Sequence, residues 1–140
     1  MTTIKLSKLY IYSIGVSLFL LTSCARSLPE KLTDGNFKFW YSHVKEPSYL
    51  SFDYFDIKGK WKMFEDVPHY GFREYDGGDY ILSEEWHIIG DSILRLDGSQ
   101  DLRIIELTQD VMIFKSKFGR IDTLYAAPDS MIPKKFRHRW

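Results

Sequence analysis

The sequence predicts an all-β domain, an antiparallel meander that closes into a small up-and-down β-barrel. From Phe37 onward, short runs rich in Tyr, Phe, Trp, Ile and Val alternate with turns that contain Gly and Asp. The spacers are short, so consecutive strands should pair antiparallel, with Gly90-Asp91 as the clearest two-residue hairpin turn. No segment has a helical apolar stripe, and closure of the sheet would remove its exposed edges. A flattened β-sandwich and an open curved sheet are the alternative architectures.

Nine runs have the character of strands, and their alternation assigns side chains to faces. Trp86 and Ile88 share the apolar face of one run, which Glu84 interrupts. Met112 and Phe118 share a face of a later run, which predicts that both point inward. The nine runs are residues 37–43, 49–57, 60–66, 70–75, 79–89, 92–98, 102–107, 111–118 and 121–127.

Residues 1–23 have the pattern of a signal peptide. Lys5 and Lys8 precede an apolar stretch of 13 residues, Leu9 to Leu21. A membrane-spanning helix needs roughly 20 apolar residues, so this stretch is too short to span a bilayer. A positive start, a short apolar segment and small residues are typical of an exported, cleaved leader.

The end of this leader resembles the lipobox of bacterial lipoproteins. Leu21, Thr22, Ser23 and Cys24 fill its four positions, and Cys24 is the one cysteine of the chain. The resemblance implies that diacylglycerol is attached to the Cys24 thiol, that the chain is cut before Cys24, and that the new amino terminus is acylated. An ordinary secretory leader with an incidental cysteine is the alternative. Two or three acyl chains would hold the protein on a membrane stably.

The residues after Cys24 bear on location. Retention at the inner membrane is associated with Asp in the next position, and Ala25 stands there instead. The resemblance therefore implies the outer membrane of a bacterial cell envelope. Residues 25–31 lack the acidic run associated with display outside the cell, so we expect the periplasmic face.

The segments that flank the β domain are expected to be less structured. Residues 24–36 have few large apolar side chains and end in a turn signal, which predicts a tether behind the lipidated cysteine. The β domain should span residues 37–127, and residues 128–140 form a basic tail. We expect this tail to be a solvated terminus, with binding to anionic headgroups as the alternative. Without residues 1–23 the formal net charge is −2, which is not a nucleic-acid-binding balance.

Four aromatic and turn motifs follow one another through the predicted domain: FKFWYS with Trp40, FDYFDIKGKW at 52–61, EEWHIIGDSILRL at 84–96 and IIELTQDVM at 104–112. Together they resemble the lipocalin-like domains of small lipoproteins of the Bacteroides group. The resemblance implies a small up-and-down barrel, and its founding relatives bind small hydrophobic ligands. Gly59-Lys60-Trp61 also matches the Gly-x-Trp of true lipocalins. That motif belongs to their first strand and comes later here, so we treat the match as chance.

Chemistry-bearing residues are sparse. The spacing of the histidines fits no metal motif, and the single thiol is assigned to lipid, so we expect no metal, no cofactor and no enzymatic activity. Glu85 and His87 lie two residues apart, on one strand face. They could form half of a metal or acid–base site, but we favour the interpretation that this face is simply solvated. The histidines are His43, His69, His87 and His138.

The aromatic residues suggest the function. Six of them could line a ligand cavity, although filling of the core by these side chains is the simpler interpretation. We therefore expect a membrane-anchored binding module, for a small apolar ligand if one is bound. The alternative is a structural or partner-docking lipoprotein with a filled barrel and no ligand. The six residues are Trp40, Tyr54, Trp61, Trp86, Phe114 and Tyr125.

Overall fold

The computed structural model describes residues 26–43, 49–75 and 83–138. One short helix, α2 (Leu28–Thr33), precedes nine strands, and two 3-10 helices follow them at Asp129–Met131 and Lys134–Phe136. The strands are β1 (Phe37–His43), β2 (Leu50–Asp56), β3 (Trp61–Val67), β4 (Gly71–Glu74), β5 (Trp86–Ile89), β6 (Ile93–Leu96), β7 (Gln100–Leu107), β8 (Val111–Ser116) and β9 (Ile121–Ala126). All nine predicted strands are present, so the all-β prediction is confirmed.

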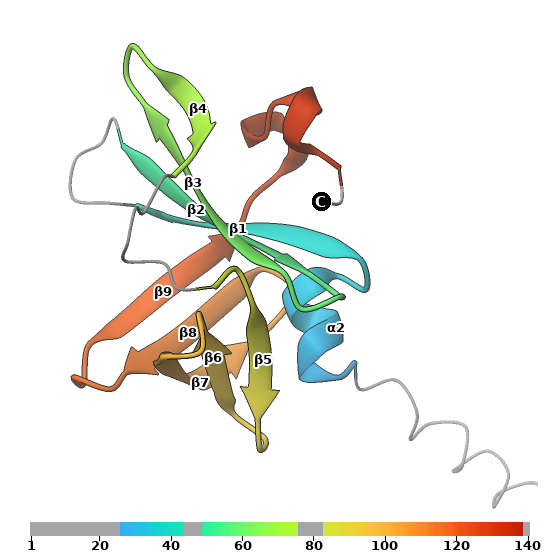
Figure 1. Cartoon of the computed structure of the whole chain (residues 1–140), viewed down its shortest axis with the longest axis vertical. Coiled ribbons are helices and arrows are strands. Elements are labelled where there is room, and N and C mark those ends of the chain that lie inside the picture. Colours follow the sequence, from blue (N-terminus) through green and yellow to red (C-terminus); the bar gives the residue numbers. More distant parts are fainter. Residues whose placement is uncertain (1–25, 44–48, 76–82, 139–140) are drawn as a thin grey trace, which may run out of the picture.

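The strands form one strongly curled antiparallel sheet in the order β4-β3-β2-β1-β9-β8-β7-β6-β5 (Figure 1). Every strand pairs with its chain neighbour except at the break between β4 and β5, and β1 pairs with β9 through Trp40–Ala126 and Tyr41–Tyr125. This is the order of an up-and-down barrel whose first and last strands have met. The sheet is a half-barrel that stays open between β4 and β5, in line with the alternative of an open curved sheet.

The concave face of the sheet encloses the larger apolar core. Trp40 is fully buried in it, and its indole Nε1 donates a hydrogen bond to the carbonyl oxygen of Leu32 at 2.9 Å. Strands from both ends of the chain contribute to this inner core because the sheet curls around it. Its fully or nearly buried members are Leu32, Trp40, Phe55, Trp61, Trp86, Leu94, Leu96, Ile104, Leu107, Met112 and Leu124.

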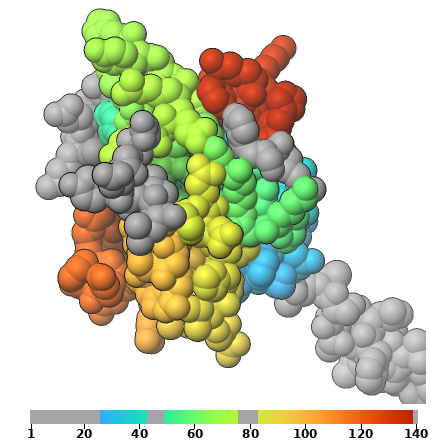
Figure 2. All heavy atoms as spheres, viewed as in Figure 1, coloured from blue at the N-terminus to red at the C-terminus, as the bar shows by residue number. Residues whose placement is uncertain are grey.

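A second, outer core covers the convex face of β1–β3. It contains Phe39, Phe52, Tyr54, Phe64 and Ile132. The C-terminal segment supplies its cover and lies on the side of β1–β3 opposite to β5–β9 (Figure 1). Figure 2 shows the same segment as a compact mass beside β4.

The C-terminal segment is not the solvated terminus that we expected. Ile132 is 3% exposed, and the ring of Phe136 lies 5.5 Å from that of Phe64 and 5.2 Å from that of Phe72. Arg137 Nε donates to the Ile132 carbonyl oxygen at 2.7 Å. Burial of these apolar groups outweighs the charge repulsion among the basic residues, so residues 129–137 fold back onto the sheet.

Residues 28–33 are likewise not a tether. They form α2, which begins with a capping box: Ser27 Oγ accepts from the Glu30 amide, and Glu30 Oε2 accepts from the Ser27 amide at 2.8 Å. Leu32 and Thr33 are completely buried. The expected tether over 24–36 is therefore wrong for this helix, which packs against the inner core.

Two details of the predicted strands are also different. Strand β8 ends at Ser116, so Phe118 lies in the β8–β9 turn and is 87% exposed instead of pointing inward. Ile89 pairs with Ile93, so three residues and not two form the turn that begins at Gly90. Residues 79–82 of the fifth predicted run, the signal peptide and Cys24 lie outside the described residues.

Candidate functional site

The open side of the sheet is bridged at one point, which we call the seam. Lys60 and Glu85 form an isolated antiparallel bridge. The Trp61 amide donates to the Glu84 carbonyl oxygen and the Trp86 amide donates to the Gly59 carbonyl oxygen, both at 2.8 Å. Strand β4 pairs only with residues 64–67 of β3, so the start of β3 is free to pair with the start of β5. Figure 2 shows the start of β5 lying directly against this part of the chain.

Gly59 is the residue that lets the two sides approach. Its φ is +89°, a conformation that residues with a side chain rarely adopt. A Cβ at this position would also lie 3.3 Å from the carbonyl oxygen of Trp86 on the opposite side. Both the backbone turn and the seam therefore require glycine here.

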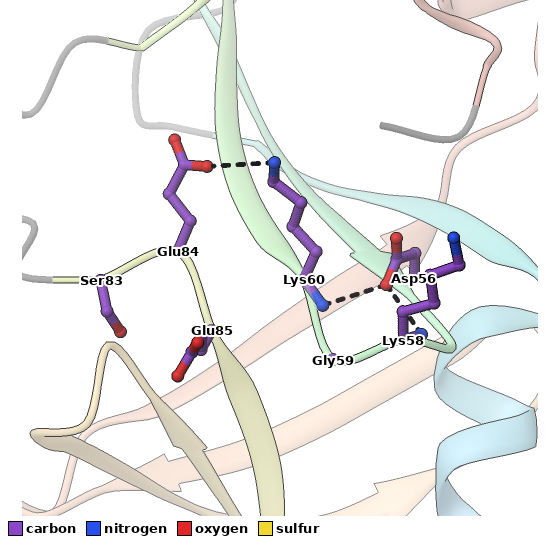
Figure 3. A pocket seen from close by; sticks show the side chains of 7 residues that line it. All are labelled: Asp56, Lys58, Gly59, Lys60, Ser83, Glu84 and Glu85. Atoms are coloured by element: carbon purple, nitrogen blue, oxygen red, sulfur yellow. Dashed lines mark hydrogen bonds and ion pairs between the residues drawn. The ribbon is translucent and has the colours of Figure 1, made fainter.

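Asp56 organises the β2–β3 turn that carries Gly59. Its Oδ1 accepts hydrogen bonds from the backbone amides of Lys58 at 2.8 Å and of Lys60 at 3.0 Å (Figure 3). Its carbonyl oxygen accepts from the indole Nε1 of Trp86 at 3.0 Å. The aspartate thus fixes the shape of the turn and holds β5 beside it.

A cavity of about 470 Å³ opens at the seam, within the size range of small-molecule sites. One wall comes from the β2–β3 turn and the other from the residues that enter β5 (Figure 3). The amide of Ser83, on the second wall, donates to Oδ1 of the buried Asp97. We call this cavity the seam pocket; it is lined by Asp56, Lys58, Gly59, Lys60, Ser83, Glu84 and Glu85.

One atom of the seam pocket has unused hydrogen-bonding capacity. Asp56 is completely buried, and its Oδ2 has no hydrogen-bond partner among the described residues. A buried acceptor without a partner costs about 1–3 kcal/mol. The atom has almost no accessible surface, so a ligand in the pocket cannot contact it, and this cost belongs to the turn that Asp56 organises.

The charged groups of the seam pocket divide into paired and unpaired ones. Glu84 pairs with Lys60 and with Lys62, each at 3.5 Å, and Lys62 also pairs with Glu74. Within the described part of the chain, the side chains of Lys58 and Glu85 have no ion pair or hydrogen bond. The exposed charged groups of the pocket without a partner among the described residues are therefore the Glu85 carboxylate and the Lys58 ammonium.

A further carboxylate lies behind the seam, on the concave face of β2. Asp53 accepts a hydrogen bond from the indole Nε1 of Trp61 at 2.9 Å. Burial raises the pKa of Asp53 to about 6, although the hydrogen bond from Trp61 acts in the opposite direction. This group changes its charge near neutral pH inside the curled sheet.

The six aromatic residues expected to line a cavity lie in three different places. Trp40, Trp61 and Trp86 are in the inner core, and Phe114 packs against it. Tyr54 belongs to the outer core, on the other face of the sheet. Tyr125 faces outward, with its ring 5.8 Å from that of Tyr41. None of the six lines the seam pocket.

Glu85 and His87, the pair singled out in the sequence, are both exposed. Glu85 lines the seam pocket, whereas His87 pairs across the strands with Arg95. No group of three or more His, Cys, Asp or Glu residues suited to a metal ion occurs among the described residues.

Of the residues that line the seam pocket, the sequence pointed to Glu85 alone as a site residue. Two further patterns in the sequence lie at this pocket. Glu84 interrupts an otherwise apolar strand face, and Asp56 to Lys60 contains a turn signal. Neither signal shows that the two segments meet.

Comparison with known protein families, curated proteins and solved structures finds no match for this chain. Among the helices in the described residues, none has the length and apolar character needed to cross a bilayer.

Proposed function

We propose that this protein is a lipid-anchored component of a bacterial cell envelope that binds a small polar ligand in the seam pocket. The charged lining of this pocket, with the exposed side chains of Lys58, Glu84 and Glu85, carries the binding part of the proposal. The ligand is held at the rim of the half-barrel, and the aromatic side chains fill its interior. The apolar ligand expected from the sequence gives way to a polar one because charged groups line this pocket.

The lipid anchor is proposed from the sequence Leu21-Thr22-Ser23-Cys24. Three residues separate Cys24 from the first residue of α2, and they span at most about 11 Å when fully extended. Arg26, within this short link, pairs with Asp34 at the end of the helix at 2.7 Å. The domain would therefore sit close to the outer membrane, on the periplasmic face.

Metabolic labelling with palmitate tests the anchor. The wild-type chain should incorporate label and partition with membranes, whereas Cys24→Ser should do neither. A matched control moves the one cysteine to an exposed position, as Cys24→Ser with Ser130→Cys. This variant should also stay unlabelled; label on it, or equal label on Cys24→Ser, would contradict lipidation at Cys24.

Amide NMR of the full lipidated protein in detergent micelles tests the binding site. A library of polar and apolar fragments is added, and the signals of Gly59, Lys60 and Glu85 are followed. We expect charged fragments to shift these signals and apolar fragments to leave them unchanged. Shifts confined to the indole signals of Trp40 and Trp61, produced by apolar fragments, would favour the aromatic interior instead.

A second candidate function, docking on another envelope component, rests on a different surface. Ile105 in β7, Ile121 in β9 and Phe118 in the turn between β8 and β9 are 54%, 59% and 87% exposed. Exposed apolar side chains that lie together are typical of interaction sites. A photo-crosslinking residue at Phe118 should capture a defined partner in cells, while the same residue at Tyr70, which is 73% exposed in another turn, should not. Equal capture from both positions would indicate non-specific contact.

A further inference from the structure

We infer that the turn between β8 and β9 enters the surface of an anionic membrane, with the ring of Phe118 in the bilayer and basic side chains on the lipid headgroups. The inference rests on the proposed lipid anchor, because the anchor would hold the membrane at close range. It goes beyond the anchor by naming a second contact, which would fix how the domain lies on the bilayer.

Phe118 protrudes from the tip of a tight turn. It is 87% exposed, more than any other large apolar side chain among the described residues. The turn follows Ser116, the last residue of β8, and Gly119 takes a φ of +85° within it. Apolar side chains of this kind insert into the boundary between headgroups and acyl chains. A protein partner would instead need a pocket that matches the protruding ring.

Ile121 extends the apolar surface beside the turn. It is 59% exposed and pairs with Lys115 of β8, which in turn pairs with Arg103 of β7. Ile104 and Phe114, the chain neighbours of these two basic residues, pack in or against the inner core. Alternation therefore places Arg103, Lys115 and Ile121 in one row across the convex face.

The charge around the turn is positive. Asp101 is paired with Arg95 at 2.6 Å, and Asp122 is paired with Arg120 at 2.7 Å. Glu106 is an exposed acid one row further from the turn. Three cations close to the turn have no ion pair or side-chain hydrogen bond within the described part of the chain: Arg103, Lys115 and Lys117.

These cations and the apolar side chains can be satisfied together at a bilayer surface. Lys and Arg keep their charge among the headgroups while their aliphatic stems lie along apolar groups. Lys117 already combines the two, since its Nζ lies 5.1 Å from the centre of the Phe118 ring. Each basic residue near an anionic surface strengthens binding about fivefold. Anionic lipid therefore fits both the charge and the exposed ring.

The turn and the proposed anchor lie at opposite ends of the half-barrel. Strands β1 and β9 are antiparallel with Tyr41 opposite Tyr125, so the β8–β9 turn is at the end of the sheet away from α2. Figure 1 shows both segments on the side of the molecule away from β4 and the C-terminal segment. Contacts at both ends would lay the domain lengthwise on the membrane. Because the anchor makes the second contact intramolecular, a weak contact is enough.

Paramagnetic NMR of the full lipidated protein in nanodiscs tests this contact. The discs contain a lipid with a nitroxide on its acyl chain, which broadens the amide signals of residues close to the bilayer. One set is made of phosphatidylcholine and another of phosphatidylcholine with phosphatidylglycerol. We expect broadening at Phe118 and Gly119 in the anionic discs, with reversal at high salt, and none at Tyr70 in the β3–β4 turn. Arg26, beside the anchor, should be broadened in both sets.

Two variants assign the contact to the charges and to the ring. Lys115→Gln with Lys117→Gln should weaken the contact about thirtyfold, while Lys134→Gln with Lys135→Gln, the same charge change on the C-terminal segment, should not. Phe118→Ser should weaken it about tenfold, through loss of apolar burial. All these side chains except the ring are exposed cations, so the remaining amide signals should show that the fold is retained.

Three results would contradict the inference. Broadening at Arg26 without broadening at Phe118 would overturn the second contact, leave the anchor standing and leave the exposed face to a protein partner. Equal broadening at Phe118 in neutral and anionic discs, or in both lysine variants, would overturn the role of the cations. No broadening at Arg26 in any disc would contradict the anchor itself.

Discussion

The two halves of the curled sheet bury their apolar residues differently. In β1–β3, side chains on both faces are buried, because β5–β9 cover the concave face and the C-terminal segment covers the convex one. In β5–β9 the described residues cover only the concave face, and large apolar side chains such as Ile105 and Ile121 are exposed on the other. Both halves contain apolar residues on two faces, so the sequence pattern alone does not define a core. What decides burial is whether another segment lies over the face.

The cover over the first half is aromatic. Phe64 and Phe72 stack with ring centroids 5.5 Å apart, and Phe136 packs edge-on against Phe64. Such pairs add about 0.5–1.5 kcal/mol to the burial of the rings themselves. The second half lacks an equivalent cover among the described residues, and its outer face is the one proposed for docking.

The largest expected difference between the two halves is the effect of a substitution at Phe64. Phe64→Ala should lower the free energy of unfolding by about 3–4 kcal/mol, because it empties the centre of the outer core. Ile121→Ala, on the uncovered face of the second half, should change it by less than about 0.5 kcal/mol. Urea unfolding followed by tryptophan fluorescence measures both. Equal effects would mean that the outer face of β9 is also covered.

The two halves should also differ in how their stability depends on pH. In the first half the group concerned is Asp53, on the concave face. Its folded-state pKa of about 6 lies above the unfolded value of about 3.9, so the folded protein binds the proton more tightly. The contribution of Asp53 to the free energy of unfolding is fully present below pH 4. It is lost as the pH rises through 6, and the loss amounts to about 2–3 kcal/mol. Asp53→Asn keeps an acceptor for Trp61 and should remove this loss, so the variant should be more stable than wild type at pH 7.5. Parallel pH curves for the two proteins would contradict the burial of this charge.

The second half contains a carboxylate with the opposite behaviour. Arg95 donates to both oxygens of Asp101 at 2.6 and 2.7 Å, and this side-chain bond lowers the pKa of Asp101. Its contribution is present at neutral pH and is lost as the pH falls through the lowered value. In Asp101→Asn, the free energy of unfolding should therefore fall less at low pH. The loss of stability above pH 4, which comes from Asp53, should be unchanged. The pair is exposed, so we expect the effect to be smaller than that of Asp53.

Phe136 tests whether the C-terminal segment is a true part of the core. Phe136→Ala should cost about 1–2 kcal/mol of stability, less than Phe64→Ala because the ring is only partly buried. Hydrogen exchange should then increase at residues 131–137 and not in β5–β9. Uniform changes across the sheet would show that the two halves unfold as one unit.

The smallest expected effect is at Phe118. Phe118→Ser removes an 87% exposed ring from a turn, so the free energy of unfolding should change by less than about 0.5 kcal/mol. The same variant should reduce any partner capture through the outer face. A large loss of stability without loss of capture would place Phe118 in a core that the structure does not show.

Much of the fold could be predicted because strand formation depends on residues that are close together in the sequence. Alternation and turn residues located all nine strands, and short turns predicted their antiparallel order. The helix α2 could also have been predicted, since Ser27, Pro29 and Glu30 form a capping-box signature. Phe118 was misplaced because alternation does not say where a strand ends.

The seam pocket depended on contacts that no local pattern encodes. Gly59 and Trp86 are 27 positions apart in the chain, and β3 and β4 lie between them. Asp56 alone is typical of a turn aspartate, and Glu85 alone is typical of a solvated strand face. They line one pocket only because the sheet curves and brings the start of β3 to the start of β5, where two backbone hydrogen bonds of 2.8 Å join them.

By itself the sequence determined the strand content of this protein and its antiparallel order, because both depend on neighbouring residues. It also predicts a lipobox-like site at Cys24. Tertiary structure alone decided which apolar faces are buried, that residues 28–33 and 129–137 fold onto the sheet, and that the β2–β3 turn and the start of β5 line one pocket. Burial and charge pairing are properties of surfaces brought together from distant parts of the chain. Gly59 shows the difference: its positive φ belongs to a local turn, but its close approach to the Trp86 carbonyl oxygen exists only because β5 lies opposite.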